Sequence, residues 1–243
     1  MENLPAGQAG KTAKYFKYAI GEIALVVIGI LIALSINNWN EQRLLISNQE
    51  TIYKQVRSDL IKDTLNLGLV IDHWEQRNIR LEKVLQKQFP KINIEFPTKK
   101  EDSIVDIYFG DIAGTFSHRI QNKGYDLIKV TRRLNSLKQD TLSSRIIDFY
   151  LKNEPPLSRN ATTLIRKTQE NIKFFEQYSW YIDWLKHRYN KDAYIYFSES
   201  EVYRKKVASF QSSAIRNYLS RLIKYNTEAK KLITVIDTYS FLK

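Results

Sequence analysis

The sequence predicts an all-α protein, with an N-terminal transmembrane helix followed by an antiparallel helical bundle of three long and two or three short helices. Three observations support this class. The chain has only eight Gly and five Pro in 243 residues, and a shortage of turn-forming residues favours long regular elements. One apolar stretch is long enough to cross a membrane. Beyond it, apolar residues recur at steps of three, four and seven, as in amphipathic helices.

The apolar stretch covers residues 18–36 and contains one charged residue, Glu22. In a helix, its 19 residues would span roughly 28 Å, close to the hydrocarbon thickness of a bilayer. A soluble core helix would carry a polar stripe, and a cleaved signal peptide has a shorter apolar region. We therefore expect residues 1–17 to form a basic cytoplasmic N-terminus, 18–38 a transmembrane helix and 39–243 an extracytoplasmic helical bundle domain.

The flanking charges predict the orientation of this helix. Three lysines precede the span: Lys11, Lys14 and Lys17. Only Arg43 and Lys54 are basic in a comparable window after it. Because positive charge stays on the cytoplasmic side, we expect a single-pass protein of the inner (cytoplasmic) membrane with its C-terminal domain in the periplasm. Tyr18 and Trp39 are expected to be interfacial anchors at the two ends of the span.

One face of the predicted span is small and polar. At 100° per residue, Gly29, Ala33 and Asn40 lie within about 20° of Glu22. Gly29 and Ala33 form a small-xxx-small pair that permits close helix approach. Two interpretations stay open: Glu22 lies near the headgroups with no further role, or this face packs against a second copy of the chain or another membrane protein.

The same residues carry a family resemblance. The stretch "YAIGEIALVVIGILIALSINNWNE", Tyr18 to Glu41, resembles the N-terminal signature of an uncharacterised family of Bacteroidota membrane proteins, with Ser35 where members often have Gln. The later stretch "NKGYDLIKVTRRLNSLKQDTLSSRIIDFYLKN", residues 122–153, resembles the second region of that family more loosely. The resemblance implies a single-pass membrane protein in an envelope with two membranes, and it implies no activity.

The first element after the span is predicted to be one long helix over residues 40–89, a possible continuation of the anchor. Its apolar stripe consists of Leu45, Ile52, Val56, Leu60, Leu67, Val70, Ile71, Trp74, Leu81, Val84 and Leu85. Gly68 is expected to mark a kink or a break. Pro90 and Pro97 bracket an extended or looped segment.

Shorter elements are predicted next. Residues 101–117 favour a short helix and a Gly-containing loop, followed by helices over about 118–137 and 140–152, the second capped by Asp140. Pro155 and Pro156 are expected to end it. A third long element is expected over about 158–189, then an interruption at 190–197. The pattern from Ser198 to Glu201 predicts a capping box that opens the last long helix.

The sequence contains no recognisable catalytic or metal-binding motif. There is no Cys, so disulfides and thiolate sites are excluded. The three histidines, His73, His118 and His187, form no helical ligand pair. No phosphate loop or nucleophile elbow is present. We expect no catalytic residue, no metal and no cofactor, and we expect that the protein is not an enzyme.

Two side-chain clusters are candidate binding surfaces. Trp180, Trp184 and Arg188 share a predicted helix face, which indicates either bundle core or an aromatic patch for a ligand or for headgroups. The last helix carries a basic set: Arg204, Lys205, Lys206, Arg216, Arg221 and Lys224. With a net charge of +12, this set fits either a solvated surface or contact with anionic lipid.

Nucleic acid is an unlikely partner outside the cytoplasm. In a cytoplasmic protein, Tyr203, Tyr218 and Tyr225, which are interleaved with the Lys and Arg residues of the last helix, could stack on nucleobases. The sequence does not identify a small-molecule ligand.

The sequence favours a membrane-anchored, non-enzymatic envelope protein that acts as a sensor, scaffold or assembly factor. A second hypothesis is an accessory subunit of an ion-driven or pore-forming membrane complex, with Glu22 as a proton or ion relay. A third is a membrane-tethered hydrolase, which would need a carboxylate pocket that only a structure can reveal.

Overall fold

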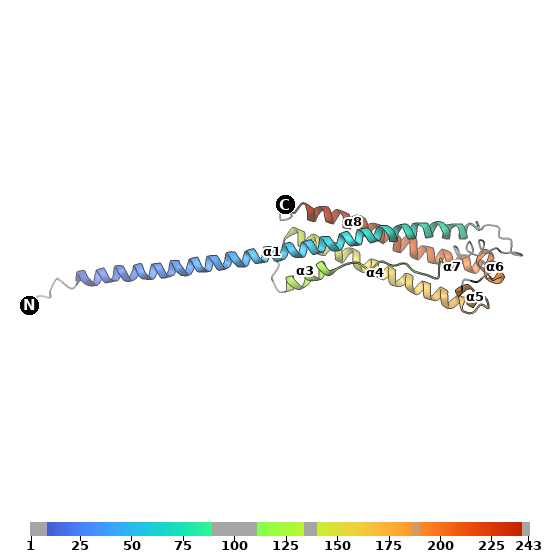
Figure 1. Ribbon diagram of the computed structural model, residues 1–243, viewed down its shortest axis with the longest axis horizontal. Helices are drawn as coiled ribbons and strands as arrows, with labels where there is room; N and C mark the ends of the chain where they lie inside the picture. Colours follow the sequence, from blue (N-terminus) through green and yellow to red (C-terminus); the bar gives the residue numbers. More distant parts are fainter. Residues whose placement is uncertain (1–8, 89–110, 134–139, 187, 189, 240–243) are drawn as a thin grey trace, which may run out of the picture.

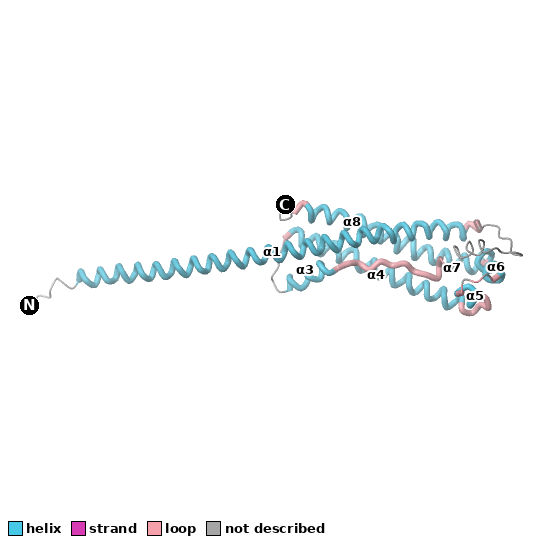
Figure 2. Tube along the Cα trace, in the orientation of Figure 1, coloured by secondary structure: helices cyan, strands magenta, loops and turns pink. Residues whose placement is uncertain are grey.

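The computed structural model describes residues 9–88, 111–133, 140–186, 188 and 190–239. These residues form an elongated molecule in which one helix projects far beyond a bundle (Figure 1). Within the described ranges there are helices and loops and no strand (Figure 2). The predicted all-α class is therefore confirmed. The predicted segment between Pro90 and Pro97 and the short helix at 101–110 lie outside the described residues.

Helix α1, Ala9–Leu85, is a single 77-residue helix. It passes the predicted end of the membrane span at residue 38 without interruption, as the sequence suggested. The predicted kink or break at Gly68 is wrong, because the helix is regular there and the space beside the glycine is open. The helix ends in a Schellman motif: Lys87 has φ 57°, and the Gln88 N–H donates to the Lys83 carbonyl over 2.8 Å.

Half of α1 forms part of the bundle and half does not. Every described side chain from residue 19 to residue 48 is exposed, and Gln49 is the first buried one. From there the buried face repeats at steps of three and four, so that one stripe points inwards: Ile52, Val56, Leu60, Asp63, Leu67, Val70, Trp74, Arg77, Leu81 and Val84. The predicted apolar stripe of this helix is therefore largely the core stripe.

The bundle has four legs that alternate in direction. The second part of α1 runs outwards, the segment from residue 111 to the end of α3 (Lys123–Arg133) runs back, α4 (Thr141–Phe175) runs outwards, and α7 to α8 return. Neighbouring legs α1 and α8 are antiparallel, as are α4 and α8, whereas α1 and α4 are parallel. The predicted antiparallel bundle of three long and two or three short helices is confirmed, and the short α3 forms part of the second leg.

The second leg is only partly helical. Residues 111–122, here called the non-helical segment, lie alongside α1 and α4 (Figure 2). The predicted helix over 118–137 therefore begins five residues late, at Lys123. The backbones of α3 and α1 approach closely where the non-helical segment joins α3. A Cβ atom on Gly124 would lie 2.5 Å from the Val56 backbone nitrogen.

Helix α4 begins as predicted and ends much later. Asp140 caps it, since its carboxylate accepts from the Ser143 N–H over 2.6 Å. The predicted stop at Pro155 and Pro156 is wrong, and α4 continues to Phe175. The two prolines free the carbonyls of Leu151 and Lys152, which belong to exposed residues and can be solvated. The long helix expected over 158–189 is accordingly the second half of α4.

The far end of the bundle holds two short helices, α5 (Tyr181–Leu185) and α6 (Lys191–Glu199). The predicted interruption at 190–197 is wrong, because Asn190 caps α6 through the Asp192 and Ala193 N–H groups. The predicted capping box also shifts. Ser200, not Ser198, is the N-cap of α7 (Glu201–Gln211), and its hydroxyl accepts from the Tyr203 N–H.

The last leg joins α7, a π-helical segment η1 (Ser212–Leu219) and α8 (Ser220–Asp237). Its buried residues Phe210, Ala214, Tyr218 and Leu222 follow at steps of four. In an α-helix each such step turns the side chain about 40° away from the previous one. The wider turns of the π-helix remove this drift and keep all four residues on the inner face.

The close approach at Gly124 gives a test of the fold. Gly124→Ala would push a methyl group into the backbone of Val56, and we expect it to lower the free energy of unfolding by about 1–3 kcal/mol. Thermal melts of the full chain in detergent, followed by circular dichroism, measure this loss. Gly114→Ala is the control, because a Cβ atom there would meet only Arg77 Nη2 at 3.9 Å, an ordinary contact, and it should therefore cost less than Gly124→Ala. Equal melting temperatures for the two variants would contradict the packing at Gly124.

Candidate functional site

The buried polar side chains gather where the non-helical segment lies against the helices. A helix satisfies its own backbone groups, but the inward-facing backbone groups of a non-helical leg need partners from elsewhere. Side chains of the long helices supply them. Trp74 Nε1 donates to the Phe116 carbonyl over 2.8 Å, and Asn171 Nδ2 donates to the Ile112 carbonyl over 3.0 Å. The His118 N–H donates to the Tyr218 hydroxyl over 3.0 Å.

Asp63 is the centre of this network and is fully buried. Its carboxylate accepts from the Gln121 N–H over 3.0 Å and from the Tyr225 hydroxyl over 2.6 Å, and it lies 2.8 Å from His118 Nε2. Burial raises the pKa of Tyr225, and the negative charge of Asp63 raises it further. One carboxylate of α1 therefore holds the non-helical segment and α8 together.

Asp59, one helical turn earlier, makes the equivalent contact at the start of α3. Its Oδ2 accepts from the Gly124 N–H over 2.7 Å, and its Oδ1 accepts from Gln55 Nε2 over 2.7 Å. Tyr150 of α4 donates to the Gln121 carbonyl over 3.2 Å. All three long legs thus bind the backbone of the second leg.

Arg77 fixes the other end of the non-helical segment. Its guanidinium donates to the carbonyls of Asp111 and Gly114 and lies over the rings of Trp74 and Phe210, with 4.8 Å and 5.2 Å to the centroids. Burial lowers the pKa of Arg77 to about 10, although the neighbouring Asp111 carboxylate opposes that change.

Arg80 adds a bidentate pair to Asp111 over 2.7 and 2.9 Å. This is the geometry of a strong Arg–carboxylate contact.

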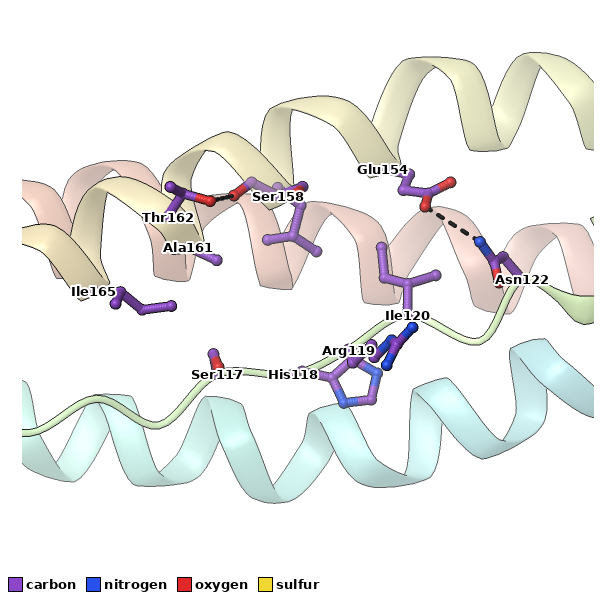
Figure 3. Close-up of a pocket in the computed structure, with 11 residues that line it drawn as sticks. Ser117, His118, Arg119, Ile120, Asn122, Glu154, Ser158, Ala161, Thr162 and Ile165 are labelled. Atoms are coloured by element: carbon purple, nitrogen blue, oxygen red, sulfur yellow. Dashed lines mark hydrogen bonds between the residues drawn. The ribbon is translucent and has the colours of Figure 1, made fainter.

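A pocket of about 340 Å³ lies between the non-helical segment and α4 (Figure 3). Arg119 and Glu154 are its charged residues, and Asn122 Nδ2 donates weakly to Glu154 over 3.5 Å. Ile120, Leu157, Ala161 and Ile165 are among its apolar lining residues. The His118 ring points towards α1 and away from α4 (Figure 3). Among the described residues, Glu154 is therefore the single carboxylate that lines this pocket.

A second polar junction marks the place where α1 leaves the bundle. Asp140 accepts hydrogen bonds from Gln49 Nε2 over 2.8 Å, from the Tyr53 hydroxyl over 2.8 Å and from the Tyr239 hydroxyl over 2.7 Å. Burial alone would raise the pKa of Asp140, but the Ser143 N–H and the two phenols outweigh it and lower that pKa. One carboxylate thus joins α1, the start of α4 and the end of α8.

The residues of the predicted membrane face lie on the projecting half of α1. Glu22, Gly29, Ala33 and Asn40 are all exposed, and nothing lies within 4 Å of a Cβ atom placed on Gly29. Trp39 is exposed, with Arg43 5.5 Å from its ring centroid. Tyr18 belongs to α1, but its side chain lies outside the described ones.

The predicted aromatic patch is part of a larger cluster at the far end of the bundle. Trp180 is buried and stacks on Tyr178 with 5.0 Å between centroids, and Trp184 is half-buried against Phe175. The predicted shared face with Arg188 is wrong, because α5 ends at Leu185 and Arg188 follows in a turn. The arrangement matches the bundle-core interpretation of the two tryptophans.

The residues of the predicted basic set differ in exposure and in their partners. Arg204 pairs with Glu201, Lys206 lies 3.9 Å from the Phe174 ring centroid, and Lys224 lies 3.9 Å from Glu228. Lys205, Arg216 and Arg221 are exposed. The interleaved tyrosines Tyr203, Tyr218 and Tyr225 are fully buried, so they cannot stack on nucleobases.

Sequence reasoning missed the buried polar residues, although the pattern held a signal. The predicted stripe jumps seven residues from Leu60 to Leu67 and again from Trp74 to Leu81. Asp63 and Arg77 occupy the intervening core positions. Charged residues are almost never fully buried without partners. Two charges at core positions therefore indicate that polar groups of other parts of the chain pack against them.

No group of three or more His, Cys, Asp or Glu side chains that could hold a metal ion occurs among the described residues. In the same part of the chain, one helix is long and apolar enough to cross a membrane, and its apolar stretch is not buried within the molecule. These features define a class of all-α proteins in which a helical bundle is built on the continuation of an apolar N-terminal helix, and they fit a membrane-anchored protein.

Within this class, the chain belongs to the family of unknown function DUF6090, whose family model matches residues 22–153. The match covers the apolar helix from Glu22 and ends in α4, so it includes α1 to Leu85, the non-helical segment and α3. The expectation of a family without an assigned function is confirmed. No curated protein and no solved structure matches the chain.

Removing the central carboxylate tests the network. Asp63→Ala would leave the buried Tyr225 hydroxyl and the Gln121 N–H without their acceptor, and we expect the free energy of unfolding to fall by about 2–5 kcal/mol. Urea titration of the full chain in detergent measures this change. Asp72→Ala, at an exposed position of the same helix, should change it by no more than about 0.5 kcal/mol. Similar losses for both variants would show that Asp63 does not organise the interior.

Proposed function

We propose that the chain is a single-pass inner-membrane protein that holds its helical bundle outside the cytoplasm as a non-enzymatic scaffold, sensor or assembly factor. The observation that carries this proposal is the continuity of α1, which is both the apolar helix and a core helix of the bundle. A bundle connected by one unbroken helix cannot reorient freely on its anchor.

The dimensions of α1 support a raised position for the bundle. Residues 37–48 are exposed and helical between the end of the apolar stretch and Gln49, the first buried residue. At about 1.5 Å per residue, these 12 residues form a stalk of roughly 18 Å. The Asp140 junction then fixes the stalk to α4 and α8. The bundle would therefore stand at a set height above the headgroups, which suits a protein that presents a surface to partners.

Labelling at single cysteines tests the anchorage and the orientation, because the chain has no cysteine of its own. We expect that Ser212→Cys, at an exposed position of the bundle, reacts with a membrane-impermeant maleimide in cells whose outer membrane has been permeabilised. Asn3→Cys should react only after the inner membrane is broken, because positive charge keeps the N-terminus inside. The reverse pattern, or recovery of the chain in the soluble fraction, would contradict the proposal.

The second candidate function is a relay subunit, and the exposed Glu22 on the apolar helix is the observation that favours it. A relay needs an ionisable group in the membrane, whereas a packed or interfacial residue tolerates glutamine. The scaffold proposal expects Glu22→Gln to restore growth fully in a strain that lacks the chain. A growth defect equal to that of the deletion strain, at a normal membrane level of the variant, would favour the relay.

A further inference from the structure

The outer face of α1 in the bundle carries an apolar patch that no described part of the chain covers. Leu65 and Leu69 are 69% and 74% exposed. Among the described residues that follow the apolar stretch 18–36, no other large hydrophobic side chain is as exposed as either. They lie one turn apart, so their side chains are neighbours. This solvent-facing pair on a bundle helix is a candidate contact surface.

Gly68 lies beside this pair and has no role within the single chain. It is helical, its φ is not positive, and nothing lies within 4 Å of a Cβ atom placed on it. A glycine inside an exposed helix costs about 0.5–1 kcal/mol relative to alanine. The missing side chain does, however, let another helix approach the backbone closely. The patch thus combines apolar side chains with room for a neighbour.

The patch is aligned with the small face of the apolar helix. Leu65 follows Gly29 by 36 residues, and Leu69 follows Ala33 by 36 residues. Thirty-six residues are ten turns of 3.6, so each pair lies on the same side of the helix, about 54 Å apart. Because α1 is unbroken over this distance (Figure 1), the two surfaces point in one direction.

We propose that a second copy of this chain covers this side of α1, in a parallel two-fold dimer that runs from the membrane into the bundle. The inference rests on the proposed membrane anchorage. Two copies that cross one bilayer in the same direction have parallel α1 helices with equal residues at equal heights. A two-fold axis along the membrane normal then brings Gly29 and Ala33 against their twins and, 54 Å further, Leu65 and Leu69 against theirs.

This geometry explains why the occupant is a second copy. A different partner would need two complementary surfaces at the same spacing on one rigid element, whereas the chain supplies them to itself. Packed helices have interaxial distances of about 8–10 Å. The distance between the two α1 axes would therefore differ by only a few ångströms between the close approach at Gly29 and the leucine packing at Leu65. Both contacts form together when the two helices are nearly parallel.

Crosslinking at two heights tests the dimer in the intact membrane. Single cysteines are placed on the proposed face as Ala33→Cys and Leu65→Cys, with Leu31→Cys on the opposite side of the apolar helix and Ile223→Cys on the exposed side of α8 as controls. A short bis-maleimide should link both face variants into a product of twice the chain mass and link the controls severalfold less. The double variant Leu65→Lys/Leu69→Lys should lower the yield at Ala33→Cys without loss of helicity, because both positions are exposed.

The other outcomes overturn the proposal. Dimers at Ala33→Cys without dimers at Leu65→Cys would confine the contact to the membrane. A product of another mass at Leu65→Cys would show that a different protein covers the patch. Absence of both products from a chain that stays in the alkali-washed membrane pellet would exclude the dimer and leave the proposed anchorage standing. Loss of the chain from that pellet would remove the anchorage itself, and the dimer with it.

Discussion

The structure depends on holding a non-helical leg of the bundle, residues 111–122, against three helical ones. Residues 111–122 cannot satisfy their own backbone groups, so the long helices do so with Asp63, Arg77, Asn171 and Tyr218. These side chains are costly to bury alone and stable only with their partners. The same bonds therefore explain why charged residues occupy core positions of α1 and why the four legs take one arrangement.

Asp63 and Asp140 bind different parts of α1. Asp63 connects the middle of the helix to the non-helical segment and α8, whereas Asp140 closes the bundle where α1 leaves it. Together with Arg77 near the far end, they hold α1 at the start, the middle and the end of its core stripe. This arrangement makes the exposed half of the helix a rigid extension of the bundle, which is the physical basis for the proposed scaffold and for the alignment of the outer face of α1 with Gly29.

Much of the helical framework could be predicted from sequence, because periodicity reports which residues face inwards. The stripe from Ile52 to Val84 and the cap at Asp140 are examples. The rest depended on contacts distant in sequence. Asp63 and Arg77 looked like gaps in an apolar pattern. Their burial could not be predicted locally, because their hydrogen-bond partners lie on other legs. Pro155 and Pro156 suggested a helix end, yet the carbonyls that they free belong to exposed residues. The non-helical segment itself has no periodic pattern.

Hydrogen exchange at the backbone of residues 114–124 tests the central claim most directly. In the full chain in detergent, the amides of His118, Gln121 and Gly124 have side-chain acceptors: Tyr218, Asp63 and Asp59. The account predicts that peptides containing these amides exchange as slowly as the core of α4, although they precede or begin a helix. Exchange as fast as in a solvent-exposed loop, with α4 still protected, would contradict it.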